Sequence, residues 1–161
     1  MIAPVKTVLT GRRMHLMGSE IETIYSGNDY RDLIQSFLVT KFCSRGLRVY
    51  KEITFGTNLL GKKRRVDLFC ISNNKALIIE CKYQQSNGTA EEKLYLTLQD
   101  LNTLNIPSVL VFGGSGYSSN MLHMLRTNRN AVFFDPKNNT KELIDYLAAT
   151  FEWWDLIVGD S

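Results

Sequence analysis

The chain has 161 residues, 44% of them hydrophobic and 22% charged, and a formal net charge of +3. This is the length of one ordinary domain with a core of its own, and the composition excludes disordered and fibrous proteins. No segment approaches the roughly 20 apolar residues of a membrane span, and the first ten residues lack the apolar run of a signal peptide. We therefore expect a cytoplasmic protein of bacterial, archaeal or phage type with no membrane partner. The mild positive charge permits nucleic-acid binding without arguing for it.

The three cysteines give no sign of a disulfide framework or a zinc site. Their number is odd, and no two of them have CxxC spacing. Cys43 falls in a predicted helix, whereas Cys70 and Cys81 fall inside apolar strands. We expect all three to be buried, reduced thiols.

The first predicted elements are an N-terminal arm and a helix. Residues 1–26 are weakly patterned, with one short helix expected near 18–25. Asn28 and Asp29 then start a helix, with Asp29 as its cap, and the apolar residues that follow recur at helical spacing. Gly46 ends this helix.

Three strands follow in a meander. Residues 47–55 alternate between apolar and polar side chains, and a polar loop over 56–63 separates them from a second strand at 64–71. A third strand covers 75–83. The turn between the second and third strands is Asn73-Asn74, because asparagine tolerates the positive φ that a tight hairpin turn requires.

The second half of the chain alternates between helices and strands. Thr89 and Glu92 form a capping box for a helix over 90–105. The remaining elements are, in order, an apolar strand at 108–112, a turn at 113–116, a helix at 119–126, a short strand at 131–134 and a last helix from Thr140 through Trp154.

This order of elements predicts an α/β fold, with a mixed central sheet and helices on both of its faces. The strands after residue 105 are apolar throughout, as expected for the parallel interior of the sheet. Without repeats or linkers, residues 1–161 form a single domain, with an arm at 1–26, a core at 27–135 and a C-terminal helix at 136–161.

Two charged residues, Glu80 and Lys82, interrupt what should be a buried strand. Side chains two positions apart lie on the same face of a strand, so these two point the same way. With the turn centred on Asn73-Asn74, Asp67 on the preceding strand directly faces Glu80. A Glu-Cys-Lys triplet alone would favour an ordinary surface salt bridge. The facing carboxylate of Asp67 and the apolar flanks of both strands favour a functional site instead.

Two carboxylates held this close repel each other unless a positive charge lies between them. A divalent cation is the obvious candidate, because oxygen ligands suit Mg²⁺ and suit neither zinc nor copper. The same register pairs Cys70 with Leu77 on the opposite face, which agrees with a buried thiol.

Asp67 followed by Glu80-Cys81-Lys82 on the next strand resembles the signature of the PD-(D/E)XK nuclease superfamily. Type II restriction enzymes, archaeal Holliday-junction resolvases and some repair and homing nucleases belong to that superfamily. The resemblance covers roughly residues 29–105. It implies a restriction-endonuclease-like αβββαβ core and a metal-dependent DNA endonuclease of restriction, homing or junction-resolving type.

The resemblance also implies roles for individual residues. Asp67 and Glu80 would bind Mg²⁺, or Mn²⁺ in its place, together with the backbone carbonyl of Cys81. Lys82 would position or help to deprotonate the attacking water. Gln84 has the same strand parity as Glu80 and Lys82, so it could extend the catalytic site.

The chain departs from the family pattern at two places. Val66 stands where the family often has proline. Many members also place a glutamate on the leading helix near the metal, and this helix has none where it is expected. Asp32 or Glu52 could substitute for it, or the site could use one well-held metal, so the number of metal ions stays open.

The expected partners are DNA and a second copy of the chain. The segment 83–93 resembles the corresponding segment of some restriction-type and phage members, which favours double-stranded DNA. Basic residues ahead of Asp67 would hold backbone phosphates, although a solvated loop is an alternative for them. These residues are Lys62, Lys63, Arg64 and Arg65. Cutting both strands favours a homodimer or higher homo-oligomer, and Trp153 and Trp154 either pack internally or form the contact.

Two other functions remain as alternatives. One is a catalytically silent DNA-binding or scaffolding module of the same fold, which the intact set of Asp67, Glu80 and Lys82 disfavours. The other is a nucleotide-binding regulator built on the glycine turn at 113–116. That turn lacks a complete GxGxxG pattern and a Walker lysine, so an ordinary turn is favoured.

Overall fold

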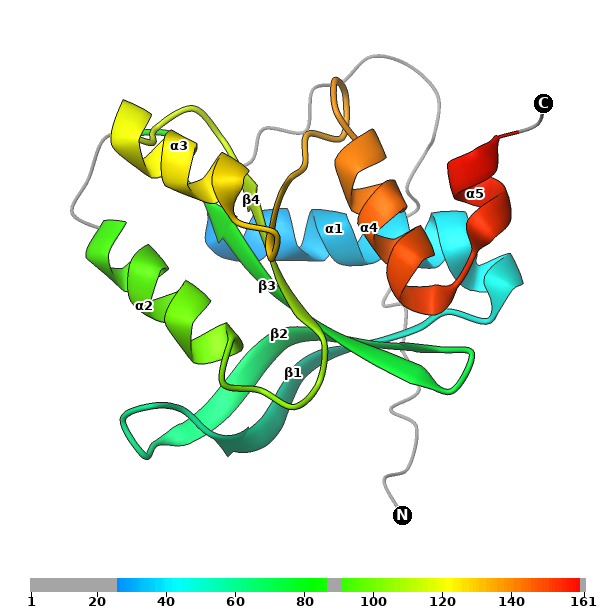
Figure 1. Ribbon diagram of the computed structural model, residues 1–161, viewed down its shortest axis with the longest axis horizontal. Helices are drawn as coiled ribbons and strands as arrows, with labels where there is room; N and C mark the ends of the chain where they lie inside the picture. Colours follow the sequence, from blue (N-terminus) through cyan, green and yellow to red (C-terminus); the bar gives the residue numbers. More distant parts are fainter. Residues whose placement is uncertain (1–25, 87–90, 160–161) are drawn as a thin grey trace.

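The computed structural model describes residues 26–86 and 91–159 (Figure 1). The short helix expected at 18–25 and the capping residue Thr89 lie outside these ranges. The described elements are, in chain order, α1 (Gly27–Phe42), η1 (Cys43–Arg45), β1 (Arg48–Thr57), β2 (Lys63–Ser72), β3 (Lys75–Tyr83), α2 (Glu91–Leu101), β4 (Ser108–Gly113), α3 (Ser119–Thr127), β5 (Ala131–Phe133), α4 (Lys141–Phe151) and α5 (Trp154–Val158).

The sheet has five strands in the order β1-β2-β3-β4-β5. The first three form an antiparallel meander, and β4 and β5 then add in parallel orientation. The predicted mixed α/β sheet with flanking helices is therefore confirmed. β4 is a buried interior strand, whereas β5 is a short strand at the edge.

Helix α1 begins one turn earlier than the sequence suggested. The hydroxyl of Ser26 accepts the N–H of Asp29 at 3.2 Å and donates to the Asp29 carboxylate at 2.8 Å. Ser26 is thus the N-cap, and Asp29 is its reciprocal partner three residues later rather than the cap itself. After the 3-10 turn η1, Gly46 ends the helical segment in the left-handed conformation.

The β2–β3 hairpin has the predicted register and turn. Leu68 pairs with Ile79, and Cys70 pairs with Leu77. Asn73 and Asn74 both adopt positive φ, 49° and 58°, as a two-residue turn of type I′ requires. Local sequence therefore determines which residues of the two strands face each other.

Helices cover both faces of the sheet and create two hydrophobic cores. In Figure 1, α2 and α3 lie together on one side, and α1 and α4 lie together on the other. The first core joins α1 and α4 to one face, with Ile34, Leu38 and Leu147 completely buried. The second joins α2 and α3 to the other face, with Leu98 and Leu125 among its members.

The C-terminal helix is interrupted, contrary to the prediction of one continuous helix. α4 ends at Phe151 because Glu152 adopts a left-handed conformation with φ of 62°. Trp153 is buried and stacks on Phe42 with ring centroids 5.0 Å apart, whereas Trp154 is exposed on α5.

Two of the three cysteines have the predicted environment. Cys70 and Cys81 are buried and free. Cys43 is exposed, because it lies where α1 gives way to the 3-10 turn rather than on the buried face of the helix. Within residues 26–86 and 91–159, no helix has the length and apolar character needed to cross a lipid bilayer.

Candidate active site

The backbone pairing between β2 and β3 ends next to Asp67. The β2–β3 ladder runs from the turn to the pair Leu68–Ile79. One residue further, the Oδ2 atom of Asp67 accepts the backbone N–H of Cys81 at 2.8 Å. A side-chain carboxylate thus satisfies an N–H that a continuous ladder would pair with a backbone carbonyl.

Strand β3 presents different chemistry on its two faces. Ile79 and Cys81 belong to the first core, below α1 and α4. Glu80 and Lys82 pair with Leu110 and Phe112 of β4, which belong to the second core. Because paired residues share a face, Glu80 and Lys82 lie together on the α2–α3 side, and alternation along the strand accounts for this.

The carboxyl group of Glu80 lies in a partly desolvated place beside the charge of Asp67. Burial raises the pKa of Glu80 to about 8, and the negative charge of Asp67 and a hydrogen bond to it add to the effect. The cations Lys82 and Arg64 act in the opposite direction without compensating for it. The pair therefore lacks positive charge, and a cation held by both carboxylates would supply it.

The acidic residues considered as additional ligands are engaged elsewhere. Asp32 accepts Nε and Nη2 of Arg31 at 3.1 Å, and Glu52 accepts Nη1 of Arg31 at 3.0 Å. Lys51 also reaches Asp32, at 3.3 Å. In the part of the chain that the structure describes, no three His, Cys, Asp or Glu side chains gather closely enough to hold a metal ion.

A model of the PD-(D/E)XK nuclease superfamily domain matches residues 6–154. The chain belongs to the PD-(D/E)XK nuclease superfamily. A sequence search of curated proteins finds no significant match. Among solved structures, the crystal structure of a protein of unknown function, AF1548, matches over 74% of this chain with a TM-score of 0.47 and 11% identity. The chain spans 65% of the length of that protein.

The basic run of this PD-(D/E)XK domain divides between solvent and interior. Lys62 and Lys63 are exposed, and the side chain of Arg65 is 70% exposed. Arg64 is buried and forms an ion pair with Asp100 of α2, so it is withdrawn from the exposed basic surface. Its Nε and Nη1 atoms are buried without a partner among the described residues.

Strand alternation could have revealed the different position of Arg64. It has the parity of Val66, which is completely buried in the second core below α2 and α3. The expectation of one solvated basic run is therefore wrong for Arg64, which is buried. Its partner Asp100 has no signal in the sequence. Asp100 also accepts the N–H of Leu59 and so ties the loop between β1 and β2 to α2.

Gln84 is held by the glycine turn that follows β4. Its side-chain amide donates to the carbonyl of Gly116 at 2.7 Å, and its backbone carbonyl accepts the N–H of Gly116 at 2.8 Å. A Cβ on Gly114 would collide with the carbonyl oxygen of Gln84. The turn therefore packs against the backbone at the end of β3, and this packing leaves the turn little room to cradle a phosphate.

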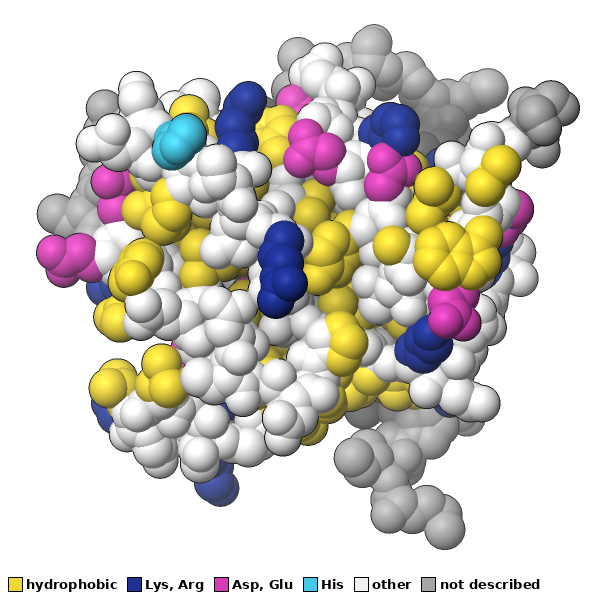
Figure 2. All heavy atoms as spheres, in the orientation of Figure 1, with side chains coloured by type: hydrophobic (Ala, Val, Ile, Leu, Met, Phe, Trp, Pro, Cys, Tyr) yellow, Lys and Arg dark blue, Asp and Glu magenta, His cyan; other side chains and the backbone are white. Residues whose placement is uncertain are grey.

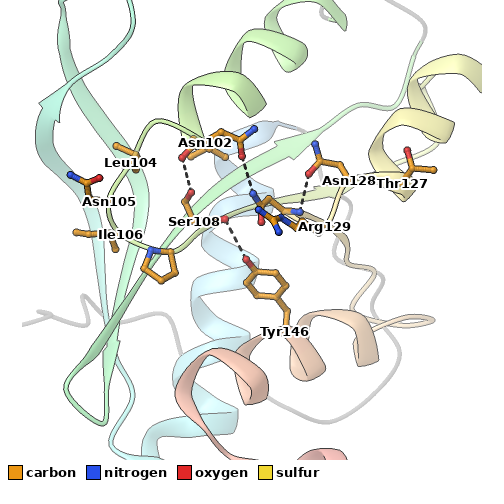
Figure 3. Close-up of a pocket in the computed structure, with 12 residues that line it drawn as sticks. Asn102, Leu104, Asn105, Ile106, Ser108, Thr127, Asn128, Arg129 and Tyr146 are labelled. Atoms are coloured by element: carbon orange, nitrogen blue, oxygen red, sulfur yellow. Dashed lines mark hydrogen bonds between the residues drawn. The ribbon is translucent and has the colours of Figure 1, made fainter.

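A hollow of about 710 Å³ lies at the other end of β4 and is separate from the acidic pair (Figure 3). The hydroxyl of Ser108 donates there to the carbonyl of Leu101, and the hydroxyl of Tyr146 donates to the carbonyl of Ser108. Ser108 begins β4, whereas Phe112, near the end of that strand, pairs with Lys82. The hollow therefore does not belong to the site at Asp67 and Glu80.

Proposed function

We propose that this chain is a Mg²⁺-dependent DNA endonuclease that hydrolyses phosphodiester bonds in double-stranded DNA. The observation that carries the proposal is the partly desolvated acid pair, Asp67 and Glu80, on adjoining strands where the sheet opens. Lys82 lies on the same face as Glu80. Membership of a nuclease superfamily supports a nucleic-acid substrate.

The donor set fits Mg²⁺, with Mn²⁺ as a substitute. Asp67, Glu80 and the backbone carbonyl of Cys81 would hold the ion, and all of these donors are oxygens. The Cys81 thiol belongs to the first core, so a thiolate ligand is not part of the set. Bound there, the cation would supply Lewis-acid polarisation of the phosphodiester and positive charge against the negative charge that develops on it.

Lys82 would act on the water and on the phosphate. Its ammonium is close enough to Glu80 to favour the ionised form of that carboxyl group. From this position it would orient the attacking water and stabilise negative charge on the phosphate oxygens. Gln84 would have a positioning role, because Gly116 fixes its side chain just beyond the end of β3, two residues after Lys82.

The DNA backbone would be held by basic residues around the start of β2. Lys62, Lys63 and Arg65 are exposed there, two to five residues ahead of Asp67 in the sequence. Such contacts add affinity without sequence information. Arg64 is assigned a different task in the proposal: its ion pair with Asp100 would hold β2 against α2.

The active form would be a homodimer, which the exposed apolar residues of α5 support. Trp154, Ile157 and Val158 are all exposed on this short helix. Figure 2 shows hydrophobic side chains at the surface over α5 and also over α2 and α3. Sedimentation of the full chain, compared with Trp154→Ser, tests this proposal. A wild-type monomer at micromolar concentration would contradict it.

Cleavage of supercoiled plasmid tests the proposed activity. We expect nicking with Mg²⁺, none with EDTA, and nicking that is about 100-fold slower or more with Lys82→Ala. A pure wild-type protein that nicks no DNA with Mg²⁺ or Mn²⁺, but still binds duplex DNA, would favour the catalytically silent binding module. Four-way junctions and linear duplexes in parallel reactions separate a junction-resolving enzyme from one of restriction or homing type.

A further inference from the structure

Three carboxylates lie at corresponding positions on three adjacent strands. The pairs Lys51–Leu68 and Ile53–Val66 flank Glu52 and place it across from Asp67. The β2–β3 register places Asp67 across from Glu80 in the same way. A regular sheet would therefore bring Glu52, Asp67 and Glu80 into one row.

Glu52 leaves this row. Its backbone has φ of 56°, a left-handed conformation that is strained for a residue with a side chain. The ladder skips the Glu52–Asp67 pair, although the pairs on both sides of it are formed. Accordingly, no cluster of three potential metal ligands is present in residues 26–86 and 91–159.

Arg31 holds Glu52 in this diverted position. It projects from the first turns of α1, and its side chain is 9% exposed. Nη1 donates to Glu52 at 3.0 Å, while Nε and Nη2 donate to Asp32. Burial lowers the pKa of Arg31, but its carboxylate partners and the charge of Asp67 outweigh burial and raise it. The guanidinium therefore lies within electrostatic reach of both Glu52 and Asp67.

We propose that Arg31 limits this site to one divalent cation. It holds Glu52 away from Asp67 and supplies there the positive charge that a second ion would bring. The inference rests on the proposed function, in which Asp67 and Glu80 bind a single Mg²⁺ or Mn²⁺. A buried guanidinium suits this task, because it stays charged and its donors match two carboxylates at once.

Counting bound Mn²⁺ on the full chain tests the inference without measuring cleavage. Calorimetric titration gives the stoichiometry and Kd, and the electron paramagnetic resonance signal of free Mn²⁺ gives an independent count. We expect one ion for the wild type and two for Arg31→Gln. This substitution removes the nearer and buried cation from Glu52 and leaves only the exposed Arg65, whose Nη2 is 3.8 Å from Oε1 of Glu52. Lys51→Gln is the matched control. It removes a cation whose ion pair, among the residues that the structure describes, is with Asp32, and it should leave the count at one.

A second pair of variants shows whether Glu52 is the group that Arg31 restrains. The double variant Arg31→Gln, Glu52→Gln should return the count to one. Glu52→Gln alone should leave both the count and the Kd of the wild type unchanged. If Arg31→Gln does not fold, as judged by circular dichroism, Glu52→Gln alone still tests the inference. If Glu52 were a metal ligand in the wild type, Glu52→Gln would bind Mn²⁺ about 10-fold or more weakly, and this result would contradict the inference.

The possible failures can be told apart. Two ions on the wild type, or one ion on a folded Arg31→Gln variant, would overturn the inference and leave the metal-dependent nuclease standing. No Mn²⁺ bound by the wild type, with the same result for Asp67→Asn, would overturn the proposed function itself.

Discussion

The two faces of β3 have the same backbone and almost opposite chemistry. Below α1 and α4, Leu77, Ile79 and Cys81 are all buried in the larger core. Below α2 and α3, the strand continues from Ile78 into Glu80 and Lys82.

The difference shows which face stabilises the fold and which carries the chemistry. Apolar burial on the first face contributes free energy of folding, whereas each partly desolvated charge on the second face costs free energy. The raised pKa of Glu80 is the sign of that cost. Substitutions that change one face should leave the property of the other face largely intact.

The largest effect is expected for Lys82→Ala on the polar face. Its kcat for DNA cleavage should fall by about 10²–10⁴-fold, because an ammonium that assists proton transfer or stabilises charge is lost. The Kd for DNA should change little. Lys41→Ala, which removes an exposed lysine at the end of α1, should retain wild-type kcat. A comparable loss in both variants would contradict the assignment.

Leu38→Ala on the apolar face should lower the free energy of unfolding by about 2–5 kcal/mol, because it leaves a cavity in a completely buried site. Urea denaturation measures the change. The neighbouring Val39 is 44% exposed, so Val39→Ala should cost no more than about 0.5 kcal/mol. Equal losses in the two variants would mean that α1 does not pack as described.

In the metal-free protein, Glu80 on the polar face should make the free energy of unfolding depend on pH. Burial raises the pKa of Glu80 from 4.5 to about 8 on folding. Between these values the folded chain retains a proton that the unfolded chain has released. The contribution of Glu80 to the free energy of unfolding should therefore fall as pH rises from about 4.5 to about 8, and level off above that.

Thermal melts of wild type and Glu80→Gln in EDTA across this pH range measure that contribution. The glutamine variant should lack this part of the pH dependence, so the difference between the two proteins should grow toward pH 8. A difference that stays constant with pH would show that Glu80 does not titrate in this range.

The smallest effect is expected at the exposed lysines. Lys62→Ala and Lys63→Ala should each weaken binding of any duplex modestly and lower the slope of log K against log salt by about 1. Fluorescence anisotropy with two unrelated duplexes at several salt concentrations measures both quantities. Lys137→Ala, in the exposed loop before α4, serves as the control. A loss that depends on the DNA sequence would argue against backbone contacts.

The central hairpin could be predicted because its determinants are local. Alternation of side chains specifies the faces of β3, and an Asn-Asn turn specifies the register with β2. Those two facts place Asp67 opposite Glu80, and the superfamily match agrees with the resemblance that they support.

The surroundings of the hairpin could not be predicted in the same way. The diversion of Glu52 depends on a left-handed backbone and on Arg31 from another element, and neither has a short-range sequence signal. The break at Glu152 is similar, because a left-handed glutamate is not favoured by its sequence. By contrast, Arg64 could have been recognised as inward-facing from its strand parity.

The close packing of Gly114 against Gln84 has a genetic consequence. Gly114 has φ of 92°, and any side chain there would collide with the carbonyl oxygen of Gln84, just beyond the end of β3. In a randomised library selected only for folded, soluble protein, glycine should dominate position 114. The glycine at position 61 also has positive φ, but open space surrounds it, so that codon should tolerate asparagine and other replacements. The preference for glycine at position 114 would then test the packing of this turn against the end of β3 without any assay of cleavage.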